Sequence, residues 1–228
     1  MTRSLSVAMR SPSAPYVVPF GVLLAFLGLH AIKPLPDLTD QILRLACMTA
    51  VLLVFARPVL DFRMERWAIS VLIGVAVFGV WIAPDLLFPA YRQHWIFQNA
   101  IAGAARTSLS ASGQAHPGVL ALRTIRAVII VPVIEELFWR AWLMRWLISE
   151  DFKKIPLGAF TRFSFWAVAV LFASEHGSYW DVGLIAGIVY NWWMIRTKNL
   201  GDLILAHAVT NACLCAYVIQ AGKWEYWL

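Results

Sequence analysis

Seven apolar runs alternate with short polar stretches along the chain. They cover residues 16–32, 42–55, 67–88, 119–148, 163–176, 180–195 and 203–219. A membrane-spanning helix needs about 20 mainly apolar residues, so each run predicts one span, with polar flanks extending the shortest. The moderately apolar segment 93–105 predicts an interfacial helix or an eighth span. The pattern therefore predicts an all-α, polytopic transmembrane helix bundle of seven to eight spans.

Composition agrees with a membrane protein. Hydrophobic residues make up 61% of the 228 residues and charged residues 14%, and the mean hydropathy is +0.69. A soluble domain carries about 25% charged residues. Because seven or eight spans fill a chain of this length, we expect residues 1–228 to form a single membrane domain without a soluble domain.

The net charge of +6 comes from basic residues scattered over the loops. They form no patch, so we expect no nucleic-acid partner. A cytoplasmic N-terminus puts 11 of the 19 Lys and Arg residues in inside loops and 4 in outside loops, the asymmetry typical of membrane proteins. Residues 1–15 are interpreted as a cytoplasmic tail and not as a cleaved signal. The expected location is the inner membrane of a bacterial cell.

The fourth run contains three ionisable residues, Glu135, Glu136 and Arg140. A charge at mid-bilayer costs about 2.5–3.5 kcal/mol on insertion scales, so such residues mark a functional site by default. Glu136 and Arg140 are four residues apart and share a helix face, which predicts an ion pair. Glu135 lies about 100° away around the helix and has no local counter-ion. A purely structural ion network is the alternative interpretation.

Two other runs offer polar side chains at helical spacing. Phe172 precedes His176 by four residues, and His207 precedes Asn211 by four. Residues four apart point to the same side of a helix, so His207 and Asn211 can face one atom. We expect Glu135, His176 and the pair His207 and Asn211 to meet inside the membrane. Glu175, beside His176, could orient its imidazole or face water.

These patterns together resemble the CAAX prenyl protease and bacteriocin-processing family, also called abortive-infection-like. The three motifs are E-E-x-x-x-R, F-x-x-x-H and H-x-x-x-N, within residues 135–211. We therefore interpret residues 119–219 as the catalytic core helices. The resemblance implies an intramembrane endopeptidase of the glutamate type, with a membrane-anchored or lipidated protein or peptide as substrate, cleaved near its C-terminus.

The resemblance also implies a role for each motif residue. Glu135 corresponds to the general base, acting with His176 on a water molecule, and His207 and Asn211 correspond to the pair that stabilises the oxyanion. The remaining motif residues correspond to structural supports, and they are Glu136, Arg140 and Phe172. Residue chemistry fits, because donors in a site of low dielectric stabilise developing negative charge.

The sequence does not indicate a serine or cysteine nucleophile. There is no Ser in a G-x-S-x-G setting, and Cys47, Cys213 and Cys215 lie in apolar runs without metal or disulfide spacing. The cysteines are interpreted as packing residues, which leaves water as the expected nucleophile.

Three alternatives stay open. We expect no cofactor, but Glu135, His176 and His207 together form a permissible ligand set for a catalytic zinc. A proton-coupled transporter would use the same three residues as a proton path, although no internal repeat supports it. A non-catalytic membrane scaffold could retain the fold. Membrane lipid is the expected environment. The sequence does not indicate whether the protein forms oligomers.

Overall fold

The computed structural model describes residues 11–99 and 102–227, and in this part of the chain all regular elements are helical. The elements, in chain order, are α2 (Ala14–Ile32), α3 (Asp37–Val51), α4 (Trp67–Leu87), α5 (Ala111–Gln114), α6 (Pro117–Ile125), α7 (Val131–Glu136), α8 (Met144–Trp146), α9 (Arg162–Ser174), α10 (Trp180–Thr197) and α11 (Leu200–Ala221). The expected all-α class is confirmed for the described residues. The expected tail, residues 1–15, lies largely outside them, and α2 already begins at Ala14.

Four helices are long and apolar enough to cross a membrane. They are Asp37–Val59, Trp67–Leu87, Pro117–Trp146 and Leu200–Ala221. Two shorter apolar helices, Ala14–His30 and Arg162–Ser174, fall below that length. All seven apolar runs form helices, yet the predicted count of seven to eight spans is not confirmed, because α9 has only 13 residues and a full span needs about 20.

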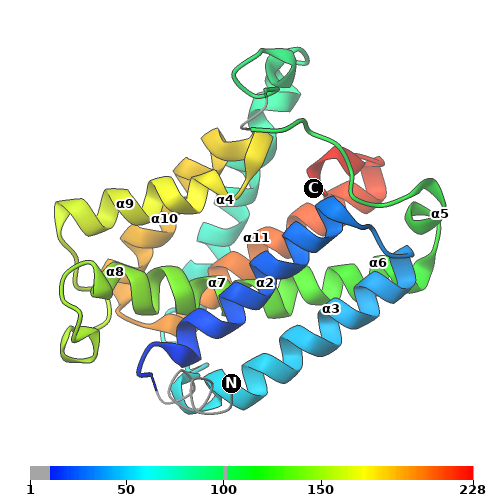
Figure 1. Cartoon of the computed structure of the whole chain (residues 1–228). Helices are drawn as coiled ribbons and strands as arrows, with labels where there is room; N and C mark the ends of the chain where they lie inside the picture. The colour runs from blue at the N-terminus through cyan, green and yellow to red at the C-terminus, as the bar shows by residue number, and fades with distance from the viewer. Residues whose placement is uncertain (1–10, 100–101, 228) are drawn as a thin grey trace.

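In its described residues, the segment 93–105 forms neither the interfacial helix nor the eighth span that the sequence left open. Its described residues form turns around a single antiparallel bridge between Asn99 and Gly103. Gly103 has a φ of 75°, a left-handed conformation that glycine adopts at no steric cost. The segment therefore reverses direction within a few residues and adds no span. Figure 1 shows it projecting beyond the end of α4.

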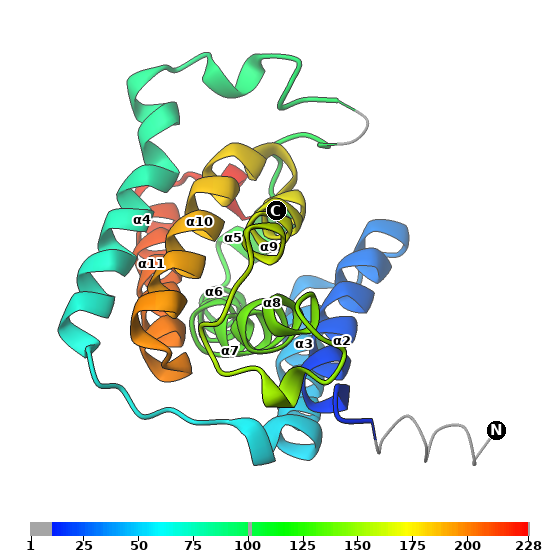
Figure 2. The same ribbon diagram turned by 90° about the vertical axis from the view of Figure 1, so that its left-hand side faces the viewer.

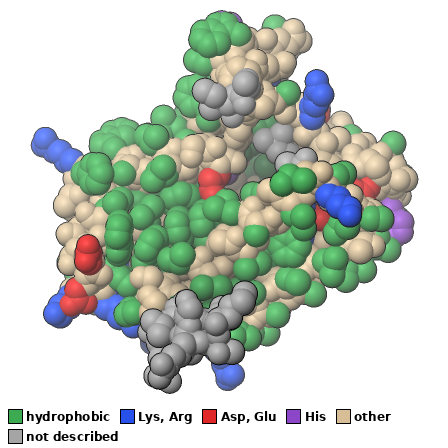
Figure 3. Space-filling model, in the orientation of Figure 1, with side chains coloured by type: hydrophobic (Ala, Val, Ile, Leu, Met, Phe, Trp, Pro, Cys, Tyr) green, Lys and Arg blue, Asp and Glu red, His purple; other side chains and the backbone are tan. Residues whose placement is uncertain are grey.

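Much of the molecular surface is apolar. Leu53, Leu72 and Ile129 are each more than half exposed, and hydrophobic side chains cover a large part of the face in Figure 3. A soluble monomer rarely exposes apolar patches beyond a few hundred Å². Such a surface suits contact with lipid, and together with the four long apolar helices it indicates an integral membrane protein. Cys47 also lies on this surface, so its expected packing role was wrong.

One long helical unit, Pro117–Trp146, runs through the middle of the molecule. It contains two wide π-helical segments, Arg126–Ile130 and Leu137–Leu143, on either side of α7. Pro132 follows the first segment, and a proline inside a helix removes one backbone hydrogen bond. Wide turns rotate the residues beyond them around the helix and occur often at functional sites. Here they flank the two glutamates at the end of α7.

Two groups of helices enclose this central unit (Figure 2). α4, α10 and α11 lie on one side and α2 and α3 on the other, while α9 packs along α10. α11 approaches α4 so closely that a Cβ at Gly74 would collide with the backbone oxygen of Ala206. Small residues permit such close helix contacts in membranes. Thr210 strengthens this contact by donating from its hydroxyl to the Gly74 carbonyl at 2.9 Å.

Local sequence signals fix where the helices of the site begin and end. Thr161 and Ser164 form a capping box at the start of α9, and the Asn199 side chain accepts from the Asp202 amide at the start of α11. These caps satisfy amides that have no partner within the helix. Lys198, in a left-handed conformation, ends α10. The short link between α10 and α11 thereby sets the position of the His207 motif.

Candidate active site

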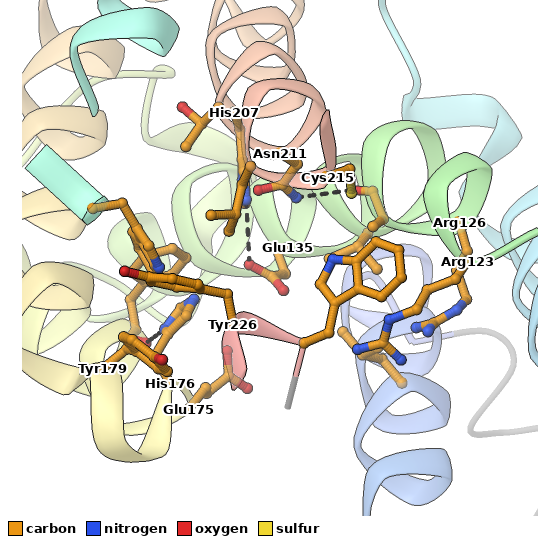
Figure 4. A pocket seen from close by; sticks show the side chains of 18 of the residues that line it. Arg123, Arg126, Glu135, Glu175, His176, Tyr179, His207, Asn211, Cys215 and Tyr226 are labelled. Atoms are coloured by element: carbon orange, nitrogen blue, oxygen red, sulfur yellow. Dashed lines mark hydrogen bonds and ion pairs between the residues drawn. The ribbon is translucent and has the colours of Figure 1, made fainter. Parts of the chain in front are cut away.

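A cavity of about 260 Å³ lies between the central helix and its neighbours. Its lining includes five of the seven predicted site residues, from α7, α9, α11 and the turn after α9. They are Glu135, Phe172, His176, His207 and Asn211. Figure 4 shows Glu135, His207 and Asn211 side by side, with His176 and Glu175 across the cavity. Figure 3 shows a hollow flanked by hydrophobic side chains, with an acidic side chain at its edge.

Glu136 and Arg140 lie behind the cavity, and both are fully buried. Nη1 of Arg140 donates to Oε1 and Oε2 of Glu136, each at 3.0 Å. Its Nε donates to the Asn191 side chain at 2.9 Å, and its guanidinium lies 4.4 Å from the centre of the Phe172 ring. This ion pair therefore ties α9 and α10 to the central helix. A buried charge is tolerated only when it is paired and hydrogen-bonded in this way.

His207 connects the ion pair to Glu135. Its Nδ1 is 2.7 Å from Oε1 of Glu136, and its Nε2 is 3.9 Å from Oε2 of Glu135. An ionised carboxylate only accepts hydrogen bonds, so Nδ1 carries a proton and Nε2 faces Glu135. The Tyr190 ring stacks on the imidazole with 5.1 Å between centres, and the Tyr190 hydroxyl donates to Thr210 at 2.7 Å. The orientation of His207 is thus fixed from two sides.

His176 is held by the backbone of the preceding turn. Its Nδ1 lies 2.8 Å from the carbonyl oxygen of Phe172, four residues earlier. Because a carbonyl can only accept, Nδ1 donates, and Nε2 of the neutral imidazole keeps a lone pair. The Trp81 ring packs edge-on at 5.1 Å, and a Cβ at Gly183 would come within 3.2 Å of the imidazole. These contacts fix the orientation of the His176 ring in the cavity wall.

Asn211 is anchored to the central helix. Its side-chain nitrogen donates to the carbonyl of Ala127 at 2.8 Å, and Ala127 lies in the wide segment Arg126–Ile130. A primary amide has two N–H groups, so one remains for another acceptor. The sequence predicted that His207 and Asn211 share a helix face, and both do line the cavity. It could not reveal that one Asn211 donor is used on the protein itself.

Three further polar residues belong to this arrangement. Trp139 donates from Nε1 to the Glu175 carboxylate at 3.2 Å, and Glu175 lines the cavity. The sequence had left the role of Glu175 open. Tyr190 and Asn191, on α10, were missed. Asn191 could have been found from the sequence, because it is an amide in an otherwise apolar run and an amide in a membrane needs a partner. The Asn191 side chain accepts a hydrogen bond from Arg140 and donates to the Phe165 carbonyl, each at 2.9 Å.

A metal was the alternative considered for these groups. Among residues 11–99 and 102–227, no group of three or more His, Cys, Asp or Glu side chains is arranged to hold a metal ion. Glu135 and His207 lie near one another, but His207 directs its other nitrogen to Glu136. The arrangement offers a carboxylate, an imidazole lone pair and an amide donor around one cavity, which are the groups needed to activate water and to bind an oxyanion.

Comparisons with known proteins agree with the motifs. Residues 117–213 match the sequence model of a family described as "Type II CAAX prenyl endopeptidase Rce1-like". No curated protein and no solved structure gave a significant match to the chain. The matched segment contains all three motifs and both wide helical segments. Residues 117–213 are therefore similar to the Rce1-like CAAX prenyl endopeptidase family, in agreement with the resemblance seen in the motifs.

Proposed function

We propose that this protein is an intramembrane endopeptidase that hydrolyses a peptide bond with a water molecule activated by Glu135. The substrate is a membrane-anchored or lipidated protein or peptide, cleaved near its C-terminus. The family match over residues 117–213 supports peptidase activity, and the apolar helices support action within a membrane. The bias of basic residues towards one set of loops in the predicted seven-span topology is in favour of a cytoplasmic N-terminus.

The proposal depends mainly on one observation, which is that the Glu135 carboxylate faces the cavity with a buried oxygen that lacks a hydrogen-bond partner among the described residues. Its side chain lines the cavity, and its buried Oε2 has no hydrogen-bond partner among the described residues. Glu136, the adjacent residue, is by contrast fully paired. A buried polar atom without a partner needs an explanation, since it costs about 1–3 kcal/mol. A bound water molecule, the nucleophile of the proposed reaction, supplies the missing partner.

In the proposed reaction Glu135 takes a proton from that water, and the hydroxide attacks the carbonyl carbon of the scissile bond. Nε2 of His176, with its lone pair towards the cavity, holds the other hydrogen of the water and orients it. Glu135 then returns its proton to the nitrogen of the leaving peptide as the tetrahedral intermediate collapses. A carboxylate that alternates between base and acid in this way typically contributes about 10²–10⁴ to the rate.

The oxyanion of the intermediate accepts hydrogen bonds from His207 and from the second N–H of Asn211. Because Nδ1 of His207 already donates to Glu136 at 2.7 Å, donation from Nε2 requires the imidazolium. One oxyanion donor of this kind is worth about 3–4 kcal/mol.

The test is peptide cleavage by the detergent-purified protein. A library of membrane-anchored and lipidated C-terminal peptides is incubated with the wild type and with Glu135→Gln, each with and without a chelator. Cleavage that is lost in the variant and unaffected by the chelator supports the glutamate mechanism. Loss in both would favour zinc bound by Glu135, His176 and His207. Cleavage of no peptide would contradict the proposal and favour the transporter or scaffold interpretations.

A further inference from the structure

The long helical units run back and forth between two ends of the molecule. At one end, the link before α4 meets the start of α11, where the Asp202 carboxylate accepts from the Arg66 amide at 2.9 Å. The link after the central unit reaches the same end, because a Cβ at Gly158 would lie 2.8 Å from the backbone oxygen of Met194, near the end of α10. This end, called the basic end below, comprises residues 57–66, 145–162 and 196–199.

Contacts between other links define the opposite end. The Ser110 amide donates to the Asp37 carboxylate at 3.2 Å and so joins the start of α3 to the segment before the central unit. The Tyr226 hydroxyl donates to Asp85 at 2.8 Å and joins the residues after α11 to the last turn of α4. This end, called the cavity end below, comprises residues 33–37, 88–99, 102–116, 177–181 and 222–227.

The cavity extends from the candidate catalytic groups towards the cavity end. In the central unit its lining residues run from Arg123 and Arg126 to Glu135, and that unit begins at the cavity end. In α11 they run from His207 to Cys215, and α11 ends at the cavity end. The links at this end complete the wall with three aromatic side chains, which are Tyr179, Tyr226 and Trp227.

Towards the basic end the interior is packed solid. Glu136, Arg140 and Met144 follow Glu135 in the central unit, and Leu203 precedes His207 in α11. Each of these four side chains is less than 2% exposed. Protein interiors of this kind are packed as densely as organic crystals and leave few voids larger than a water molecule. A peptide can therefore reach Glu135 from the cavity end, but not from the basic end.

Basic residues are distributed unequally between the two ends. Among the described residues, the basic end carries nine Lys and Arg residues and the cavity end carries four. They are Arg57, Arg63, Arg66, Arg145, Lys153, Lys154, Arg162, Arg196 and Lys198 at the basic end, and Lys33, Arg92, Arg106 and Lys223 at the cavity end. An excess of Lys and Arg marks the cytoplasmic side of a membrane protein. The bias therefore favours a cytoplasmic basic end.

We propose that the cavity opens to the non-cytoplasmic side of the membrane, and that the substrate is an exported, membrane-anchored polypeptide whose cleaved segment lies on that side. The choice of substrate rests on the proposed function, whereas the side on which the cavity opens does not. A segment in the cytoplasm would have to pass the packed side chains of Arg140 and Met144 to reach Glu135.

Thiol labelling of intact spheroplasts of a bacterial host tests the orientation. Single cysteines are placed at two exposed positions in a variant that lacks the three native cysteines. Ala115→Cys marks the cavity end and Glu150→Cys the basic end. A membrane-impermeant maleimide should label Ala115→Cys in intact spheroplasts and Glu150→Cys only after permeabilisation. The reverse pattern, or equal labelling of both in intact spheroplasts, would overturn the inference.

A cysteine in the cavity wall tests the opening itself. Leu214→Cys lines the cavity, so a small charged methanethiosulfonate should modify it in intact spheroplasts. Modification only after permeabilisation, or none in either state, would overturn the inference.

A fusion to the natural sequence covers the case in which the cysteine variants do not fold. Alkaline phosphatase needs disulfides, which form outside the cytoplasm. Fused after residue 228, beside the cavity end, it should be active, and an inactive but full-length fusion would overturn the inference.

A pair of substrates separates this inference from the proposed function. One single-span membrane protein is expressed in two orientations, set by moving its lysines, so that the same C-terminal tail lies outside or inside. We expect the wild type to cleave the outside tail alone, and Glu135→Gln to cleave neither. Cleavage of the inside tail would overturn the choice of substrate. If neither tail is cleaved, the proposed function fails, while labelling still decides on which side the cavity opens.

Discussion

Removal of Arg140 tests whether the buried ion pair holds the site together. Arg140 and Glu136 are both fully buried and joined by two hydrogen bonds of 3.0 Å. In Arg140→Ala, the Glu136 carboxylate would keep only its contact with His207. Loss of one partner of a buried pair costs about 3–5 kcal/mol, because the other charge stays buried without compensation. The variant also loses the hydrogen bond to Asn191.

That cost predicts a large shift in thermal stability. For a chain of this length about 1 kcal/mol lowers Tm by roughly 2–4 °C, so Arg140→Ala should melt about 6–20 °C below the wild type. The assay follows tryptophan fluorescence of the detergent-purified protein during heating. The matched control is Arg63→Ala, which breaks the ion pair of Arg63 with Asp61 on the surface. Solvent screens an exposed pair of this kind, so it contributes little to stability, and the Tm of the control should stay close to that of the wild type.

A second substitution isolates the stranded charge as the cause. Glu136→Gln combined with Arg140→Ala removes the uncompensated carboxylate, and we expect it to recover part of the lost Tm. A Tm of Arg140→Ala equal to that of the control would refute the reasoning. A double variant less stable than Arg140→Ala would show that lost packing, and not stranded charge, dominates.

Two glycines give further predictions. Gly74→Ala should destabilise the protein by about 1–3 kcal/mol, because its Cβ would collide with the Ala206 backbone. Gly79→Ala, in the same helix but with open space around it, should leave Tm unchanged or raise it. Equal melting of the two variants would contradict the close α4–α11 contact. Gly183→Ala would press on the His176 imidazole at 3.2 Å and should lower kcat by up to about 100-fold with little change in Tm. Unchanged kcat would argue against a role for the His176 position.

The periodicity of the sequence predicted where helices form but not how many cross the membrane. Each apolar run corresponds to a helix, since an apolar stretch in lipid must satisfy its own backbone. Mean hydropathy does not show that α9 ends after 13 residues. Nor does it show that the segment 93–105 turns back at Gly103, whose φ is positive. A single glycine barely changes the mean hydropathy of a segment.

The sequence predicted site contacts within one helix, but not contacts between residues that are far apart in the chain. Spacing by four indicated the Glu136 and Arg140 pair, because such residues share a helix face. The contact of His207 with Glu136 joins positions 71 residues apart, which no helical spacing indicates. The wide segments on either side of α7 break the regular period, and for that reason the place of Arg126 in the cavity emerged only from the structure.

The most direct test of the central claim is the single-turnover cleavage rate of Glu135→Gln, measured with a lipidated peptide that the wild type cleaves. Glu150→Gln, the same substitution at an exposed position, serves as the control, and equal melting of all three proteins establishes that each is folded. We expect Glu135→Gln to be slower by at least about 10²-fold, with Glu150→Gln at the wild-type rate. Cleavage by folded Glu135→Gln at the wild-type rate would contradict the assignment of Glu135 as the base.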